Sequence, residues 1–188
     1  MTRSTRLLVG AIALVAILAV WLFYRPGADS VAIDLLREFP NAKVKNPNPD
    51  VFEVVDVTLG GDSKRAIFAK QQSRAGWTVT VPDGAWLKVS IGLKEEAWKT
   101  EGDGVYFFIG VSEGPKWEEV YQLVVNPFAN ASDRGWKDVT LDLSPYAGRT
   151  VDLIFNTRAS PPVTPGTPPR NDERGDMPLW GEPRVVIR

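Results

Sequence analysis

Two stretches, Trp77-Thr78-Val79-Thr80-Val81 and Val139-Thr140-Leu141-Asp142-Leu143, decide the fold. Apolar and polar side chains alternate in both, with a period of two residues. Successive side chains of a β-strand point to opposite faces of the sheet, so each stretch predicts a strand with one face in the core and one in water. On this pattern Trp77 shares a face with Val79 and Val81 and belongs to the core.

Similar segments recur along most of the chain and predict about nine strands. They are Val51–Thr58, Arg65–Lys70, Gly76–Val81, Trp86–Leu93, Val105–Val111, Glu118–Val125, Lys137–Leu143, Thr150–Asn156 and Arg184–Ile187. Turn-forming residues such as Gly60-Gly61-Asp62 and Pro82-Asp83-Gly84 separate them. Short strands at this spacing favour an antiparallel sandwich or barrel over residues 51–188.

The first 25 residues predict a cytoplasmic tip followed by a transmembrane anchor. Residues 7–24 are an unbroken apolar run of 18 residues, about 27 Å long as a helix, close to the roughly 30 Å of a bilayer core. Arg3 and Arg6 precede the run, which places the N-terminus in the cytoplasm and the domain outside a bacterial inner membrane. A cleavable signal peptide is the alternative. Gly10 and Ala13 belong to a small-residue stripe that could pack against a partner helix.

Two further segments differ from the strand pattern. Residues 26–50 predict a short amphipathic helix, Val31 to Phe39, and a linker containing Asn46-Pro47-Asn48-Pro49. Residues 159–176 hold five prolines followed by mixed charge, which excludes a sheet interior. This loop is either simply exposed or a stiff docking arm presenting Pro161, Pro162 and Pro165.

Composition excludes several classes of function. The chain has no cysteine and no histidine, which removes disulfides, thiolate nucleophiles and the usual general base and zinc ligand. The net charge is −1, and the three arginines before residue 26 leave −4 for the remainder, which argues against nucleic-acid binding. Asp138 and Asp142 share a strand face roughly 13 Å apart, wider than the carboxylate pairs of glycosidases. The sequence therefore predicts a protein that is not an enzyme.

Two motifs carry a resemblance to a known superfamily. Residues 136–151, WKDVTLDLSPYAGRTV, resemble a penultimate hairpin with a "DLS-x-YAG" pattern, in which Gly148 accommodates the turn. Residues 179–185, LWGEPRV, resemble the final strand of the same group, although Glu182 stands where aspartate is usual. The group is the galactose-binding-like jelly-roll β-sandwiches, which include many carbohydrate-binding modules. The resemblance implies a jelly-roll fold and is weak evidence of function.

The resemblance also implies a structural calcium ion as the one cofactor to consider. By residue type the candidates are Asp103, Asp138 and Glu182, together with Asp172 and Asp176. No DxDxDG-like loop supports any of them.

Trp98 and Trp117 follow turn-like residues and are expected at the surface. An exposed tryptophan can hold a sugar ring or a protein partner. Two functions fit these features. The first is a non-catalytic accessory subunit of an integral membrane complex, respiratory, transport or photosynthetic (a reaction centre included). The alternative is a surface-tethered module that binds carbohydrate.

Overall fold

The computed structural model describes residues 29–159 and 172–188, and the strands in these ranges form two antiparallel sheets. The predicted anchor (7–24), with Gly10 and Ala13, and Pro161, Pro162 and Pro165 lie outside the described residues. The strands are β1 (Ser30–Asp34), β2 (Val44–Asn46), β3 (Phe52–Leu59), β4 (Asp62–Ala69), β5 (Ser73–Thr80), β6 (Ala85–Leu93), β7 (Val105–Glu113), β8 (Lys116–Val125), β9 (Lys137–Asp142), β10 (Thr150–Arg158) and β11 (Pro178–Ile187).

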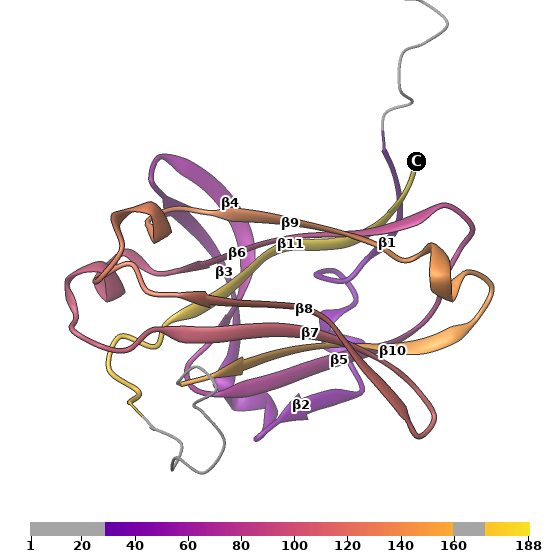
Figure 1. Cartoon of the computed structure of the whole chain (residues 1–188), viewed down its shortest axis with the longest axis horizontal. Helices are drawn as coiled ribbons and strands as arrows, with labels where there is room; N and C mark the ends of the chain where they lie inside the picture. Colours follow the sequence, from indigo (N-terminus) through magenta and orange to yellow (C-terminus); the bar gives the residue numbers. More distant parts are fainter. Residues whose placement is uncertain (1–28, 160–171) are drawn as a thin grey trace, which may run out of the picture. The chain divides into compact units, whose positions relative to one another are not determined.

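The two sheets lie face to face, as Figure 1 shows. The six-stranded sheet has the order β3-β4-β11-β6-β9, with β1 also paired to β11, and the five-stranded sheet has the order β2-β5-β10-β7-β8. Neighbouring β5, β10 and β7 come from distant parts of the sequence. The all-β class and its antiparallel sheets are therefore confirmed, and each of the nine predicted segments overlaps a strand.

The core lies between the inner faces of the sheets and is built around aromatic rings in edge-on and tilted contact. Trp180 is 1 % exposed and meets Phe107 and Phe155 at centroid distances of 5.0 and 4.8 Å. Trp77 is buried, as its alternation predicted, and packs edge-on against Phe155 at 5.1 Å. Rings at these distances contribute stability beyond their buried area.

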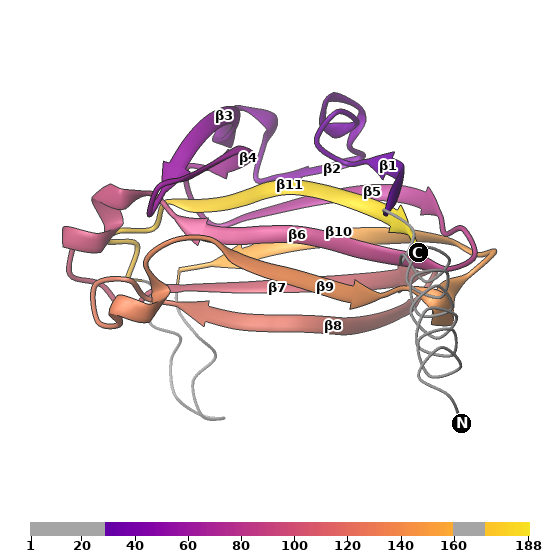
Figure 2. The same ribbon diagram turned by 90° about the horizontal axis from the view of Figure 1, so that it is seen from above.

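The predicted amphipathic helix over Val31–Phe39 is wrong. Ser30–Asp34 forms strand β1, antiparallel to the end of β11, and only a 3₁₀ turn, η1 (Phe39–Asn41), follows. Figure 2 shows β1 beside β11. The apolar residues of this segment contribute to the core, since Leu35 is fully buried. The count of about nine strands was also too low, because β1 and β2 raise it to eleven within the described residues.

The helical content of the described residues is limited to short 3₁₀ turns. Besides η1 these are η2 (Pro49–Val51), η3 (Glu95–Lys99), η4 (Ala131–Asp133) and η5 (Ser144–Tyr146). Accordingly, no helix within residues 29–159 and 172–188 has the length and apolar character needed to span a bilayer.

Candidate functional site

The outer face of the five-stranded sheet carries two layers of side chains. Strand pairing places Arg74 of β5 opposite Asn156 of β10, and Asn156 opposite Phe108 of β7. Directly opposed residues project from the same face of a sheet. We call this surface the platform; its exposed layer is Arg74, Trp117, Glu119, Gln122 and Arg158, and its buried floor is Tyr106, Phe108, Gly110, Ile154 and Asn156.

Trp117 is the exposed aromatic side chain of the platform. Its ring lies over Gly110, because a Cβ added to Gly110 would come within 2.0 Å of the ring carbon Cη2. The strand pairing is offset between Ile109 and Gly110, which is the bulge that brings β8 to this position. With one side against the glycine, Trp117 remains 43 % exposed.

Two arginines flank this ring and the floor beneath it. The Arg74 Nε donates a hydrogen bond of 2.7 Å to Oδ1 of Asn156, which is only 2 % exposed. The Arg74 guanidinium carbon lies 6.0 Å from the Trp117 ring centroid. The Arg158 guanidinium lies 4.8 Å from the Phe108 ring centroid. Stacking of this kind fixes the orientation of a guanidinium without neutralising its charge.

Tyr106 anchors the other end of the platform. Its ring stacks on Phe108 at a centroid distance of 5.2 Å, and its hydroxyl is hydrogen-bonded to Glu119 and Gln122. Burial and the Glu119 carboxylate raise the pKa of Tyr106 to about 12. The hydroxyl is therefore a neutral donor at physiological pH, and it orients two polar side chains on the surface.

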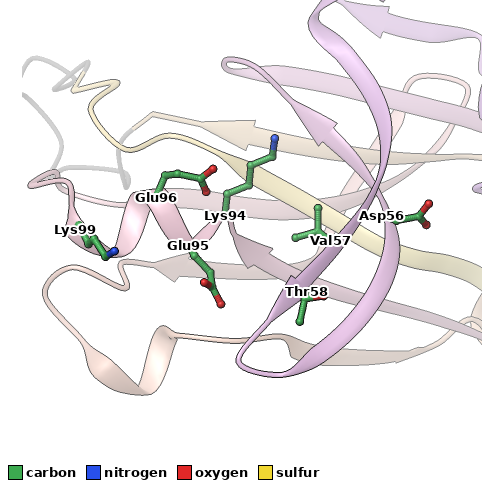
Figure 3. A pocket seen from close by; sticks show the side chains of 7 residues that line it. All are labelled: Asp56, Val57, Thr58, Lys94, Glu95, Glu96 and Lys99. Atoms are coloured by element: carbon green, nitrogen blue, oxygen red, sulfur yellow. The ribbon is translucent and has the colours of Figure 1, made fainter.

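A second concave site lies at the edge of the six-stranded sheet. A pocket of about 650 Å³ separates β3 from the η3 turn, and Figure 3 shows its lining. Val57 points from β3 towards the turn, whereas Asp56 points away from it. The lining residues are Asp56, Val57, Thr58, Lys94, Glu95, Glu96 and Lys99. Five of them are charged and none is aromatic, so this pocket lacks a surface on which a sugar ring could stack.

Trp98, expected at the surface, lies in the η3 turn and is half-buried. Its indole Nε1 donates to the carbonyl oxygen of Leu93 at 3.2 Å. Its ring packs against a small apolar cluster formed by Leu59, Ala66 and Leu179. Trp98 therefore supports the η3 turn, and of the two tryptophans only Trp117 presents a large exposed surface.

The three leading calcium candidates do not converge. Asp138 and Glu182 line one pocket of about 190 Å³ on the outer face of the six-stranded sheet, together with Lys64, Lys88 and Arg184. Asp138 accepts a 2.6 Å hydrogen bond from Ser90, and Glu182 pairs with Arg184 at 3.1 Å.

Asp103 does not line that pocket and interacts electrostatically with Asp176. The pKa of Asp176 is raised to about 8, first by burial and then by the Asp103 carboxylate. Across the described ranges, no three acidic, histidine or cysteine side chains are arranged to hold a metal ion.

Sequence reasoning singled out Trp117 but missed its surroundings. Arg74, Gly110 and Asn156 come together only through strand register, which single-strand patterns do not encode. The available signal was Gly76 and Gly110 inside otherwise regular strands. Such glycines mark places where another group approaches the backbone closely.

Comparison with other proteins gives one sequence relative and a set of structural ones. No family model matches the chain. An "Uncharacterized protein" of Archaeoglobus fulgidus is 40 % identical over 108 residues, which is 57 % of this chain. The chain spans about a quarter of that relative's length, 25 %.

Carbohydrate-binding modules are among the solved structures similar to this sandwich. CBM51 from Clostridium perfringens GH95, in complex with methyl-galactose, has a TM-score of 0.52 and 14 % identity, over 82 % of this chain and 99 % of that one. TmCBM61 in complex with beta-1,4-galactotriose has a TM-score of 0.49 and 12 % identity, over 80 % and 90 %. The second likeness is too weak for any conclusion. The first shows that this chain has the β-sandwich fold of such modules.

Proposed function

We propose that this protein is a non-catalytic carbohydrate-binding module whose binding surface is the platform. The observation that carries the proposal is Trp117, which lies on Gly110 and stays 43 % exposed. A flat, rigid aromatic ring offers a sugar an apolar surface at little cost in conformational entropy. The fold shared with CBM51 supports the same function.

The polar groups around Trp117 supply what a sugar needs for orientation. Arg74 and Gln122 offer donors, and Glu119 offers an acceptor. Asn156 and the Tyr106 hydroxyl hold Arg74 and Glu119 in place by hydrogen bonds of 2.7 and 3.0 Å. Such side chains bind a polyol with less loss of rotamer freedom than unrestrained ones.

We also propose that residues 7–24 tether this module to a bacterial inner membrane, with the sandwich on the periplasmic side. The unbroken apolar run and the preceding Arg3 and Arg6 support this placement. Protection of the sandwich from protease in intact spheroplasts would contradict it. The accessory-subunit hypothesis, by contrast, gains no support from the fold comparison.

The test uses the full chain purified in a mild detergent. A glycan array identifies candidate sugars, and calorimetric titration then measures affinity for the best of them. We expect Trp117→Ala to weaken binding at least about tenfold, because it removes a central aromatic contact. Phe128→Ala is the matched control, since Phe128 is 44 % exposed but lies off the platform.

If the Trp117→Ala variant folds correctly and binds the sugar with unchanged affinity, the sugar binds elsewhere and the assignment of the platform as the binding surface is refuted. Complete absence of glycan binding, together with stoichiometric co-purification of a membrane protein, would instead favour an accessory subunit.

A further inference from the structure

We infer that the platform selects anionic glycans, whose carboxylate or sulfate groups are bound by Arg74 and Arg158. This inference rests on the proposed function and names the class of sugar that the same surface takes. The two arginines lie on neighbouring strands, β5 and β10, and both are exposed. Arg158 lies two residues along β10 from Asn156, the residue opposite Arg74, so their Cβ atoms are diagonal neighbours roughly 7–8 Å apart.

Several other arginines of this domain form salt bridges with a carboxylate, whereas these two do not. Arg149 pairs with Glu113 at 2.6 Å, Arg174 with Asp172 at 2.7 Å and Arg184 with Glu182 at 3.1 Å. Within the described residues, neither Arg74 nor Arg158 has a carboxylate within salt-bridge distance. Aromatic rings and an amide oxygen hold them instead, which leaves their positive charge available.

Two acidic side chains of this face, Glu119 and Asp152, do not pair with either arginine within the described residues. Glu119 accepts a hydrogen bond from the Tyr106 hydroxyl, and Asp152 accepts one from Thr78. The Arg74 Nε donates to Asn156, and among residues 29–159 and 172–188 its two terminal amino groups have no hydrogen-bond partner, so they can form a paired contact. A guanidinium binds a carboxylate or sulfate in this way, with two parallel hydrogen bonds.

The arrangement therefore matches a sugar that carries both a ring and a negative charge. The ring would stack on Trp117 while its anionic group meets Arg74, whose guanidinium carbon is 6.0 Å from the Trp117 ring centroid. A second charged residue of the same chain would reach Arg158. A neutral sugar would leave both positive charges without a partner.

The experiment titrates the full chain, in detergent, with three oligosaccharides of equal length. These are galacturonate oligomers, sulfated galactan oligomers and neutral galactan oligomers. We expect at least one anionic ligand to bind about tenfold or more tightly than the neutral one, since hydrogen bonds to charged groups are the stronger kind. That affinity should fall as salt rises, and the tighter anionic ligand identifies which group is bound.

Variants separate the contribution of the arginines from that of Trp117. Arg74→Gln and Arg158→Gln should each weaken the anionic ligand about tenfold and weaken the neutral ligand by a smaller factor, so that the preference for the anionic ligand falls in both variants. Arg65→Gln is the control, because Arg65 is exposed on β4 of the other sheet.

Equal affinity for neutral and anionic oligomers, with sensitivity to Trp117→Ala, would overturn this inference and leave the proposed function intact. Insensitivity of every ligand to Trp117→Ala would overturn both.

Discussion

The contact between Trp117 and Gly110 can be broken without touching the tryptophan. In Gly110→Ala the new Cβ would lie 2.0 Å from Cη2 and 2.2 Å from Cζ2 of the ring. An ordinary contact begins near 3.4 Å, so the ring must move by about 1.4 Å or more. Gly110 lies within β7 beside the bulge and does not have a positive φ, so alanine imposes no left-handed backbone strain. Trp117, being exposed, is the group that moves.

The expected loss of stability follows from the covered part of the ring. Trp117 is 43 % exposed, so roughly 140 Å² of a side chain of about 250 Å² is covered. At about 25 cal/mol/Å² this area is worth at most about 3.5 kcal/mol. A partial displacement loses part of it, and alanine regains about 0.5–1 kcal/mol over glycine in a strand. We expect Gly110→Ala to lower the free energy of unfolding by about 1–2 kcal/mol.

A double-mutant cycle read by urea unfolding tests this account, with glycan affinity measured on the same variants. Gly110→Ala should weaken glycan binding because Trp117 no longer lies flat on the platform. In a Trp117→Ala background the same substitution should cost nothing, since its cost arises only from the ring. An equal loss of stability in both backgrounds would refute the assigned contact.

Two further predictions concern other parts of the domain. Burial, and then the Asp103 carboxylate, raise the pKa of Asp176 to about 8, so the folded chain keeps a proton that the unfolded chain releases near pH 4. The free energy of unfolding should therefore fall as pH rises from about 4 to about 8; Asp176→Asn should reduce that slope in urea titrations, and an unchanged slope would contradict the assignment. Leu35→Ala should cost about 2–5 kcal/mol because Leu35 is fully buried, whereas Val31→Ala, at a side chain 57 % exposed on β1, should change stability by less than about 0.5 kcal/mol in the same assay.

Within residues 51–188, strands such as β5 could be predicted because they bury one face more than the other, and β7, which is buried on both faces, because it is a nearly continuous apolar run. Alternation in Trp77–Val81 translates directly into buried Trp77 and Val79 and exposed Thr78 and Thr80. The turn after β9 was also predictable, since Gly148 has a φ of +72° and donates its N–H to the carbonyl oxygen of Val81. A left-handed conformation favours glycine at that position. The predicted hairpin over residues 136–151 is nevertheless wrong, because β9 pairs with β6 in one sheet and β10 pairs with β5 and β7 in the other.

The N-terminal strands were missed for two different reasons. Val31, Ile33 and Leu35 alternate with a period of two, but Val31, Leu35 and Phe39 also fit the spacing of a helix, and short apolar segments cannot separate the two. What decides for a strand is the second half of β11, Arg184–Ile187, which lies beyond the residues paired with β4 and pairs with Ser30–Asp34 instead. Strand β2 has three residues and exists because the edge of β5 supplies its partner.

The candidate site also has features that the sequence predicts and features that depend on the tertiary fold. Exposure of Trp117 could be predicted from the glycine and proline before it. Burial of Trp98 could not, because it depends on the hydrogen bond to Leu93 and on the apolar cluster at Leu59. The pairing of Arg74 with Asn156 joins residues 82 positions apart and follows from the order of β5 and β10 in the sheet.

The position of β1 determines how the domain responds to a mechanical load. A pull on the chain ahead of Ser30 acts first on the pair Ser30 and Ile187, and next on Val31 and Val186, so the ladder opens one pair at a time. Peeling off five residues releases roughly 17 Å of slack, while β11 stays paired with β6. Fully buried Leu35, whose N–H donates to the carbonyl oxygen of Pro183 at 3.0 Å, then resists further opening. We therefore expect strand β1 to be a short extensible element that yields before the platform is strained.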